Sequence, residues 1–233
     1  MTDRTRNILF SSVARFIAEG LPVTSERLYE SFDFGIKPAM IRWELQELAD
    51  SGYLRQMHPS GGRLPTDKAY RFFVRELVSR GDADTVPRRA AAFLGEFSSG
   101  NPQSFVDEVA GYLDLLGIGY ETDHGAMYES GLGSLLTHLE LPEKRDLLEV
   151  VRDFEELPDR IAACRDRWET TDEWPQVFIG ESPFTTSGHL AVVADRLAGP
   201  AGEFLLIAVG PKRMDYRKSL SLFRALERSI EEG

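Results

Sequence analysis

The segment from Lys37 to Val74, KPAMIRWELQELADSGYLRQMHPSGGRLPTDKAYRFFV, decides the fold of the N-terminal part of this chain. Its first half predicts a helix. Pro38 suits a first helical position because its missing N–H would have no partner there, and Gly52 is a residue type that ends helices. The apolar residues between them recur at helical spacing and define one buried stripe: Ile41, Leu45 and Leu48.

The second half predicts a hairpin followed by another helix. Tyr53–Gln56 and Leu64–Pro65 have the pattern of two arms, with His58–Arg63 as the tip between them. A helix then opens at Thr66-Asp67. Helix, hairpin and helix in this order are typical of a winged helix-turn-helix, which places one helix in the DNA major groove and a basic hairpin beside it.

Shorter elements make up the rest of the chain. Further helices are predicted over Asp3–Glu19, Ser25–Phe32, Arg88–Phe97, Gln103–Gly117, Gly131–Thr137, Glu143–Arg167 with an interruption at Pro158, and Tyr216–Ile230. Strands are predicted over Gln176–Gly180, Leu190–Asp195 and Phe204–Val209. The predicted fold class is α+β, with a DNA-binding domain over 1–78, a linker and connecting helix over 79–102, and an α+β domain over 103–233.

The charge is divided unevenly along the 233 residues, whose formal net charge is −11. Residues 1–80 hold 12 basic and 10 acidic side chains, a net of +2, whereas residues 81–233 hold 15 and 28, a net of −13. Because an acidic domain repels phosphate, DNA affinity must come from a localised basic face. No membrane-spanning run or signal peptide is apparent, and the single cysteine, Cys164, fits a reducing cytoplasm.

Two outward residues of the Pro38 helix are the main candidates for base contact. Arg42 can hold the O6 and N7 atoms of guanine with its forked guanidinium, and the alternative is a surface arginine paired with Gln46 or Glu47. Trp43 either packs on a sugar or a thymine methyl, or fills a gap between the helix and the wing. Both interpretations of each residue stay open.

The hairpin and the helix after it add candidates for phosphate contact. Arg63 follows two glycines at the tip, which suits a phosphate or the minor groove, with a solvated turn charge as the alternative. Lys68 and Arg71 either reach phosphates or solvate a helix face. The residues predicted to contact DNA are Lys37, Ala39, Met40, Arg42, Trp43, Gln46, His58, Ser60, Arg63, Lys68 and Arg71.

No catalytic pattern stands out. The four histidines lack a second His or a Cys at metal-ligand spacing, and Cys164 has the pattern of an inert buried helix residue. No dinucleotide-binding, Walker or nucleophile-elbow motif is present. We therefore predict no enzyme activity, no cofactor and no metal. Gly210–Arg213, before the last helix, is interpreted as structural, with an anion site at the helix start as the alternative.

Three stretches of the sequence resemble the heat-inducible transcription repressor HrcA family of bacteria. They are PAMIR at 38–42, SGGRLPTDKAYRF at 60–72 and GPKRMDY at 210–216. The family has a PATIR-type helix start and SAGRxPTDxGYRxYV in a first block, and GPxRMDY in a second. Both blocks occur here in the same order, at opposite ends of the sequence.

The resemblance implies a cytoplasmic, dimeric repressor that binds a long inverted repeat in double-stranded DNA upstream of chaperone operons. It also implies a GAF-like rear domain, an inserted dimerisation domain and the chaperonin GroEL as a partner. This chain is shorter than the family pattern, so we expect a reduced GAF-like domain and no inserted domain. Met40 and Trp43 replace the usual Thr and Asn on the outward side of the helix, so the operator is expected to differ. Lys37 replaces an often-found capping Ser and could instead reach a backbone phosphate.

Two other functions remain open at this point. A winged helix can be a protein-interaction module, and an acidic rear domain would suit a basic protein partner. A GAF-like pocket could instead bind a metabolite and make the protein a small-molecule sensor. Loss of salt-sensitive duplex binding in Arg42 and Arg63 variants would separate DNA binding from the first alternative.

Overall fold

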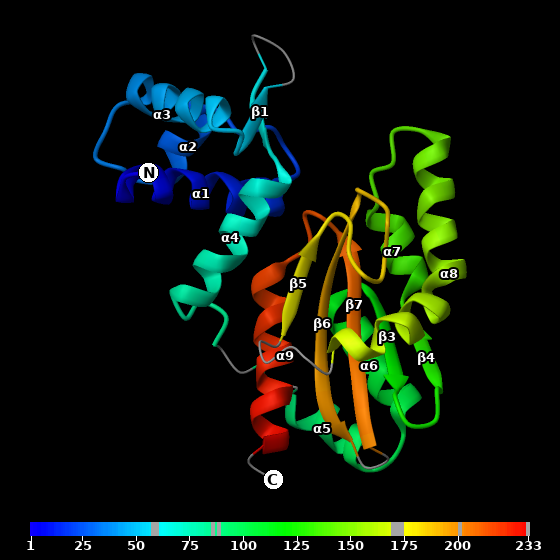
Figure 1. Cartoon of the computed structure of the whole chain (residues 1–233). Helices are drawn as coiled ribbons and strands as arrows, with labels where there is room; N and C mark the ends of the chain where they lie inside the picture. Colours follow the sequence, from blue (N-terminus) through cyan, green and yellow to red (C-terminus); the bar gives the residue numbers. More distant parts are fainter. Residues whose placement is uncertain (57–60, 85–86, 88–89, 169–174, 200–201, 232–233) are drawn as a thin grey trace. The chain divides into compact units, whose positions relative to one another are not determined.

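A computed structural model describes residues 1–56, 61–84, 87, 90–168, 175–199 and 202–231. The chain divides into two compact units, Met1–Gly81 and Asp82–Gly233. Each unit contains both helices and strands (Figure 1). Among the helices of the described residues, none has both the length and the apolar character needed to cross a membrane.

The first unit consists of four helices and a hairpin. Its elements are α1 (Asp3–Glu19), α2 (Ser25–Ser31), α3 (Pro38–Asp50), β1 (Leu54–Gln56), β2 (Arg63–Pro65) and α4 (Asp67–Ser79). Local capping sets the helix ends, because the Thr2 and Thr24 side chains accept hydrogen bonds from backbone N–H groups of α1 and α2. Gly20 ends α1 with a φ of 68°, a left-handed conformation that favours glycine. The predicted buried stripe of α3 is confirmed: Ile41, Leu45 and Leu48.

The hairpin is joined to the segment between α1 and α2. Val23 and Arg63 exchange both backbone hydrogen bonds, at 2.9 and 2.8 Å. The backbone approaches so closely beside this bridge that a Cβ added at Gly62 would lie 2.7 Å from the Pro22 Cβ and 2.8 Å from the Pro22 carbonyl carbon. Glycine at position 62 therefore serves the packing of the hairpin against Pro22, whereas the sequence pattern had suggested approach to phosphate.

The second unit is built on one antiparallel sheet. Its strands are β3 (Leu116–Glu121), β4 (Met127–Ser130), β5 (Gln176–Ile179), β6 (Leu190–Gly199) and β7 (Gly202–Pro211), in the spatial order β4-β3-β7-β6-β5. The longest pairing joins β6 and β7, from Leu190 opposite Pro211 to Gly199 opposite Gly202. The helices are α5 (Ala90–Ser98), α6 (Pro102–Leu113), α7 (Leu132–His138), α8 (Lys144–Trp168) and α9 (Tyr216–Glu231).

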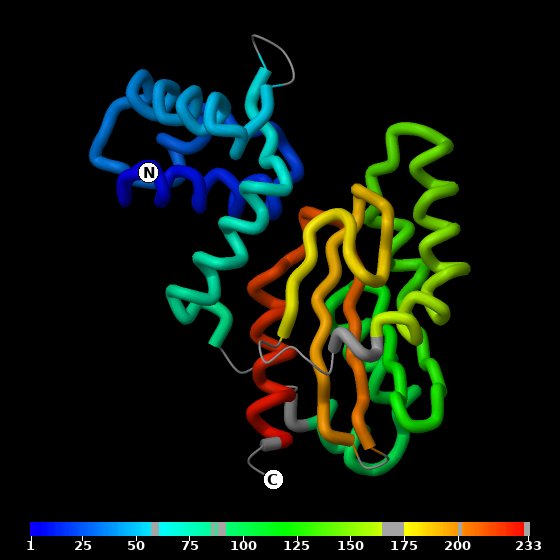
Figure 2. Tube along the Cα trace, in the orientation of Figure 1, coloured from blue at the N-terminus to red at the C-terminus, as the bar shows by residue number. Residues whose placement is uncertain are grey.

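Helices cover both faces of this sheet (Figure 2). On one face, α7 and α8 bury Leu135, Val150 and Leu157 against Ile118, Val192 and Ile207. On the other face lie α5, α6 and α9, where the aromatic rings of Phe97 and Phe105 meet that of Phe204. Because successive side chains of β6 and β7 point to opposite faces of the sheet, each face has its own hydrophobic core.

The structure differs from the sequence prediction in five elements: α5, α6, β3, β4 and α8. The helix expected to connect the domains, α5, belongs to the second unit, because its Phe93 and Phe97 are buried there. The helix expected over Gln103–Gly117 ends at Leu113 and is followed by β3, which was not predicted, as β4 was not. Helix α8 continues through Pro158 without the expected interruption.

Two fully buried aspartates lie in the second unit in different settings. Asp153 of α8 accepts hydrogen bonds from the Thr186 N–H, the Thr186 hydroxyl and the Ser187 N–H, each 2.7 Å long. Asp195 of β6 accepts a 2.8 Å hydrogen bond from the Arg196 N–H at Oδ1, while its Oδ2 is buried without a hydrogen-bond partner among the described residues. The first carboxylate therefore organises the loop before β6, and the second is left half-satisfied.

Candidate nucleic-acid interface

The outward face of α3 is the part of the first unit that best matches a DNA-reading surface. Pro38 starts the helix, and Lys37 before it is exposed and forms no side-chain cap. Every outward residue predicted to contact DNA lies on this exposed face: Ala39, Met40, Arg42, Trp43 and Gln46. The face joins one cation and two large apolar side chains, a combination that suits base edges and thymine methyl groups.

A buried carboxylate on the opposite side of α3 holds this helix on α1. Glu44 is 6% exposed, and it accepts a 3.0 Å hydrogen bond from Arg4 Nε and a 2.8 Å bond from the Thr5 hydroxyl. The ionic contact joins residues 40 positions apart in the sequence. Because charged hydrogen bonds of this kind are directional, Glu44 helps to fix which side chains of α3 face outward.

Arg42 forms an ion pair that the sequence did not suggest. Its guanidinium lies 2.8 Å from Glu26 Oε1 on α2, rather than on Gln46 or Glu47. The pKa of Glu26 is lowered, chiefly by a hydrogen bond from its own backbone, with further contributions from Ser25 and Arg42. The Arg42 side chain is still 68% exposed. Exposed ion pairs of this type are weak, so Arg42 can be released to another acceptor.

Arg63 does not lie at an exposed hairpin tip, as the sequence had suggested, and its contact with DNA stays a prediction. It belongs to β2, is 8% exposed and donates a 2.8 Å hydrogen bond to Gln46 Oε1. Burial, followed by the charge of Arg42, lowers its pKa, while Asp50 raises it. The side chain thus ties the hairpin to α3, while its backbone pairs with Val23 between α1 and α2.

Trp43 and Met40 project away from the core of the unit. The side chain of Trp43 is 62% exposed, so it is not buried in the core of the unit. Met40 is 44% exposed on the same face. Together the two side chains give this face of α3 an apolar surface that is accessible for contact.

The basic residues after the hairpin have mixed placements. Lys68 donates a 2.8 Å hydrogen bond from Nζ to the Ser51 carbonyl at the end of α3, and lies 4.3 Å above the centre of the Tyr53 ring. It therefore stabilises the C-terminal end of α3 instead of standing free on a helix face. Arg71 is exposed on α4. The candidates His58 and Ser60 lie outside the described residues.

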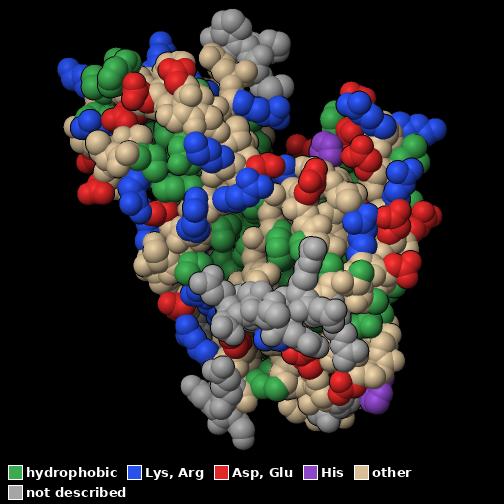
Figure 3. Space-filling view, in the orientation of Figure 1, with side chains coloured by type: hydrophobic (Ala, Val, Ile, Leu, Met, Phe, Trp, Pro, Cys, Tyr) green, Lys and Arg blue, Asp and Glu red, His purple; other side chains and the backbone are tan. Residues whose placement is uncertain are grey.

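Charges of both signs are interspersed over the visible face of the first unit (Figure 3). Several cations are engaged within the unit, such as Arg4 with Glu44 and Arg80 with Glu76. Arg55 on β1 is exposed and was not among the predicted contacts. DNA affinity would therefore depend on a few cations around α3 and the hairpin, not on a broad basic patch.

The other candidate features of the sequence concern metal binding, Cys164 and the segment before α9. No group of three His, Cys, Asp or Glu among the described residues is arranged to hold a metal ion. Cys164 is buried, as expected from its helix position. Asp215 accepts a 3.0 Å hydrogen bond from the Lys218 N–H and so caps α9, and Arg213 pairs with Glu140 at 2.7 Å.

Two charged residues that organise α3 were missed by sequence reasoning. Glu44 could have been found, because it lies three positions from Ile41 and four from Leu48 and so belongs to the inward stripe. Glu26 gives no such signal, since its partner Arg42 is 16 residues away on another helix.

Comparison with known proteins places these observations in context. No model of a known protein family matches the chain. The chain is 41% identical over 90 residues to the "Heat-inducible transcription repressor HrcA" of Synechococcus sp. (strain JA-3-3Ab), which is 39% of this chain and 23% of that protein. It is 45% identical over 78 residues to the protein of the same name from Sorangium cellulosum (strain So ce56), which is 34% of this chain and 22% of that protein. The chain thus spans about a quarter of the length of the curated relatives it matches.

A solved structure shares the fold. The crystal structure of a hypothetical protein at 2.2 Å resolution matches with a TM-score of 0.76 and 18% identity, covering 100% of this chain and 98% of that chain. An IclR family transcriptional regulator from Brucella abortus matches with a TM-score of only 0.29 and 15% identity, covering 99% of this chain and 92% of that chain. Over about a third of its length, the chain is similar to the heat-inducible transcription repressors of the HrcA family.

Proposed function

We propose that this chain is a DNA-binding transcription repressor whose first unit is a winged helix-turn-helix, with α3 as the helix that enters the major groove. The observation that carries the proposal is the outward face of α3, where Met40, Arg42 and Trp43 are exposed while Glu44 anchors the opposite side. The similarity to HrcA repressors supports the same function. The hairpin β1–β2 would lie beside the groove as the wing.

Three side chains would have separate roles in the complex. Arg42 would leave the exposed carboxylate of Glu26 and hold a guanine edge. Trp43 and Met40 would contact sugar or thymine methyl groups. Arg63 would act as a positioning residue, because its hydrogen bond to Gln46 fixes the hairpin on α3. Lys37, Arg55 and Arg71 would contribute phosphate contacts.

The second unit would be a reduced GAF-like domain that dimerises the protein or transmits a stress signal. Its net charge of −13 does not favour DNA binding, so the nucleic acid contact would belong to the first unit. Two copies would bind the two halves of an inverted repeat upstream of chaperone genes in the cytoplasm, with GroEL as the partner that the HrcA resemblance suggests. Repression would occur by occupying a promoter, and it requires no catalysis.

Fluorescence anisotropy with a matched pair of arginine variants tests the proposal. The probe is a labelled duplex that carries the inverted repeat of the HrcA family. Arg42→Ala should weaken binding by about 1–3 kcal/mol and relax selectivity at one base position. Arg75→Ala, on an exposed position of α4, removes the same charge away from α3 and should change binding much less. Equal losses in both variants would mean that α3 does not read bases.

A further inference from the structure

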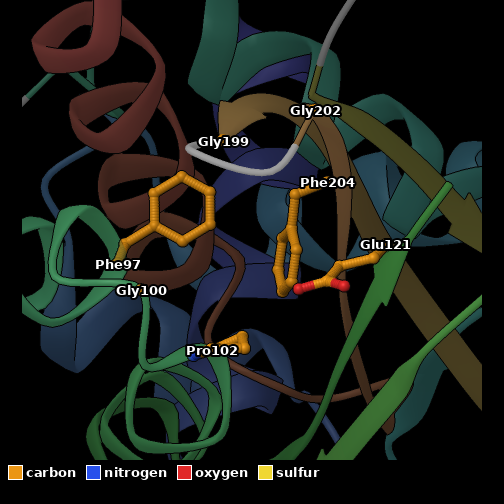
Figure 4. Close-up of a pocket in the computed structure, with 7 residues that line it drawn as sticks. All are labelled: Phe97, Gly100, Pro102, Glu121, Gly199, Gly202 and Phe204. Atoms are coloured by element: carbon orange, nitrogen blue, oxygen red, sulfur yellow. The ribbon is translucent and has the colours of Figure 1, made fainter. Parts of the chain in front are cut away.

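A small pocket lies in the second unit, apart from the DNA-reading face. Its cavity volume is about 70 Å³, well below the roughly 300–1,000 Å³ of drug-sized ligand sites, so it admits only a small ligand. The lining consists of the rings of Phe97, Pro102 and Phe204, the carboxylate of Glu121, and three glycines. Figure 4 shows the two phenyl rings beside each other above Pro102, with the Glu121 carboxylate directed toward Phe204.

The apolar wall of this pocket is preformed. The ring centroids of Phe97 and Phe204 are 5.1 Å apart, and Phe105 packs 4.7 Å from Phe97 behind them. Glycine on the neighbouring strand makes room for the Phe204 ring, because a Cβ added at Gly119 would lie 2.2 Å from its Cζ. A ligand would therefore meet rigid rings and would not have to order them.

Among the described residues that line the pocket, Glu121 is the only charged one. The Tyr128 hydroxyl donates a 3.3 Å hydrogen bond to its Oε1, and the pKa of Tyr128 is raised by burial and then by this carboxylate. No lysine or arginine among the described residues forms an ion pair with Glu121. The cation on the paired strands, Arg196, is instead 3.2 Å from Glu203.

The surroundings of the pocket are acidic as well. Asp123 follows Glu121 in the turn after β3, and its Oδ2 lies 2.1 Å from the position that a Cβ at Gly202 would take. The unit as a whole has a net charge of −13. An anionic ligand would therefore be repelled at this place, and a cation would be attracted.

We propose that this pocket binds an organic cation, a primary ammonium group on a short apolar chain. The ammonium group would form a charged hydrogen bond with Glu121, and the carbon chain would rest on Phe97, Pro102 and Phe204. The size of the pocket restricts the apolar part to a few carbon atoms. This site does not depend on the proposed DNA function.

The test is a titration of the full-length, ¹⁵N-labelled protein followed by two-dimensional NMR. The probes are n-butylammonium, n-butanol and butyrate, which share the apolar chain and differ in charge. Butylammonium should shift the amide signals of Gly100, Glu121 and Gly202 saturably. It should bind at least about tenfold more tightly than butanol, because only the cation gains the charged hydrogen bond. Butyrate should produce no saturable shift at these amides.

Two variants assign the effect to one carboxylate. Glu121→Gln should reduce the affinity for butylammonium about tenfold, to the level of butanol. Glu129→Gln, which removes an exposed carboxylate of β4 outside the lining, should leave it unchanged. On the native protein, added salt should weaken the binding of butylammonium but not that of butanol. Equal affinities for butylammonium and butanol, or full affinity in Glu121→Gln, would overturn the proposal.

Discussion

Replacing Asp195 with asparagine should stabilise the second unit at neutral pH. Burial raises the pKa of this carboxyl from 3.8 to about 8, helped by the negative charge of Glu227 and opposed by the backbone and charge of Arg196. The folded protein therefore keeps a proton that the unfolded chain releases. The stability from this group is full below pH 3.8 and is lost as the pH rises toward about 8.

The size of the effect follows from the two pKa values. Each unit of difference between the folded and unfolded pKa corresponds to about 1.4 kcal/mol. The folding stability should therefore fall by on the order of 5 kcal/mol between pH 4 and pH 8. An asparagine side chain at this position has no proton to lose, but its buried amide costs about 1–3 kcal/mol where it lacks a partner. We therefore expect Asp195→Asn to gain about 2 kcal/mol near pH 8 and to lose most of the pH dependence.

Asp153 supplies a contrasting control, because it is equally buried in the same unit but accepts hydrogen bonds at both oxygens and lies 3.9 Å from the Arg160 guanidinium. Its oxygens accept bonds from two backbone N–H groups and one hydroxyl. Asp153→Asn would turn one acceptor into a donor that faces another N–H, so it should destabilise the unit by about 1–3 kcal/mol. An aspartate-to-asparagine substitution is thus expected to stabilise the second unit at position 195 and to destabilise it at position 153.

Urea unfolding between pH 5 and 8.5, followed by two-dimensional NMR, checks both variants. The amide signals of β6 and β7 report the second unit separately from the first. The reasoning would be refuted if Asp195→Asn kept the native slope of stability against pH, or if it were less stable than the native protein at pH 8.

Two further substitutions test the packing around α3, and a third, in α5 of the second unit, serves as a control. Gly62→Ala should destabilise the first unit by about 1–3 kcal/mol in urea unfolding, because the new Cβ would press on the Pro22 backbone. Gly95→Ala, whose new Cβ would meet no atom within 4 Å, should leave the stability of the second unit unchanged or raise it slightly. Similar losses of stability in the Gly62→Ala and Gly95→Ala variants would contradict a specific role of the contact with Pro22. Glu44→Gln should cost about 1–3 kcal/mol of stability and weaken duplex binding in anisotropy, since it removes the charged partner of Arg4. Unchanged stability would show that this contact does not anchor α3.

Much of the first unit follows from local sequence signals. The predicted bounds of α1, Asp3–Glu19, match the structure, because Thr2 and Gly20 are strong capping signals. The stripe of α3 follows from its spacing alone. The placement of Arg63 was wrong for a physical reason: a charged residue after two glycines suggests an exposed tip, whereas the close approach to Pro22 draws it inward.

The missed strands of the second unit also have a physical cause. Gly117 and Gly119 lower the strand signal of β3, yet both are needed where α6 and Phe204 pack against the strand. A Cβ at Gly117 would lie 3.0 Å from the Ala110 Cβ. In the same way, the ion pair of Arg42 with Glu26 and the pocket at Glu121 depend on residues distant in the sequence. No local sequence pattern predicts this ion pair or this pocket.

The most direct measurement of the central claim is duplex binding by the native protein. Anisotropy would compare the HrcA-type inverted repeat with a scrambled duplex of the same composition over a salt series. A sequence-specific repressor should prefer the repeat by about 4–10 kcal/mol, and binding to both duplexes should weaken with salt. No binding to either duplex at low salt would contradict the assignment of the α3 face to DNA.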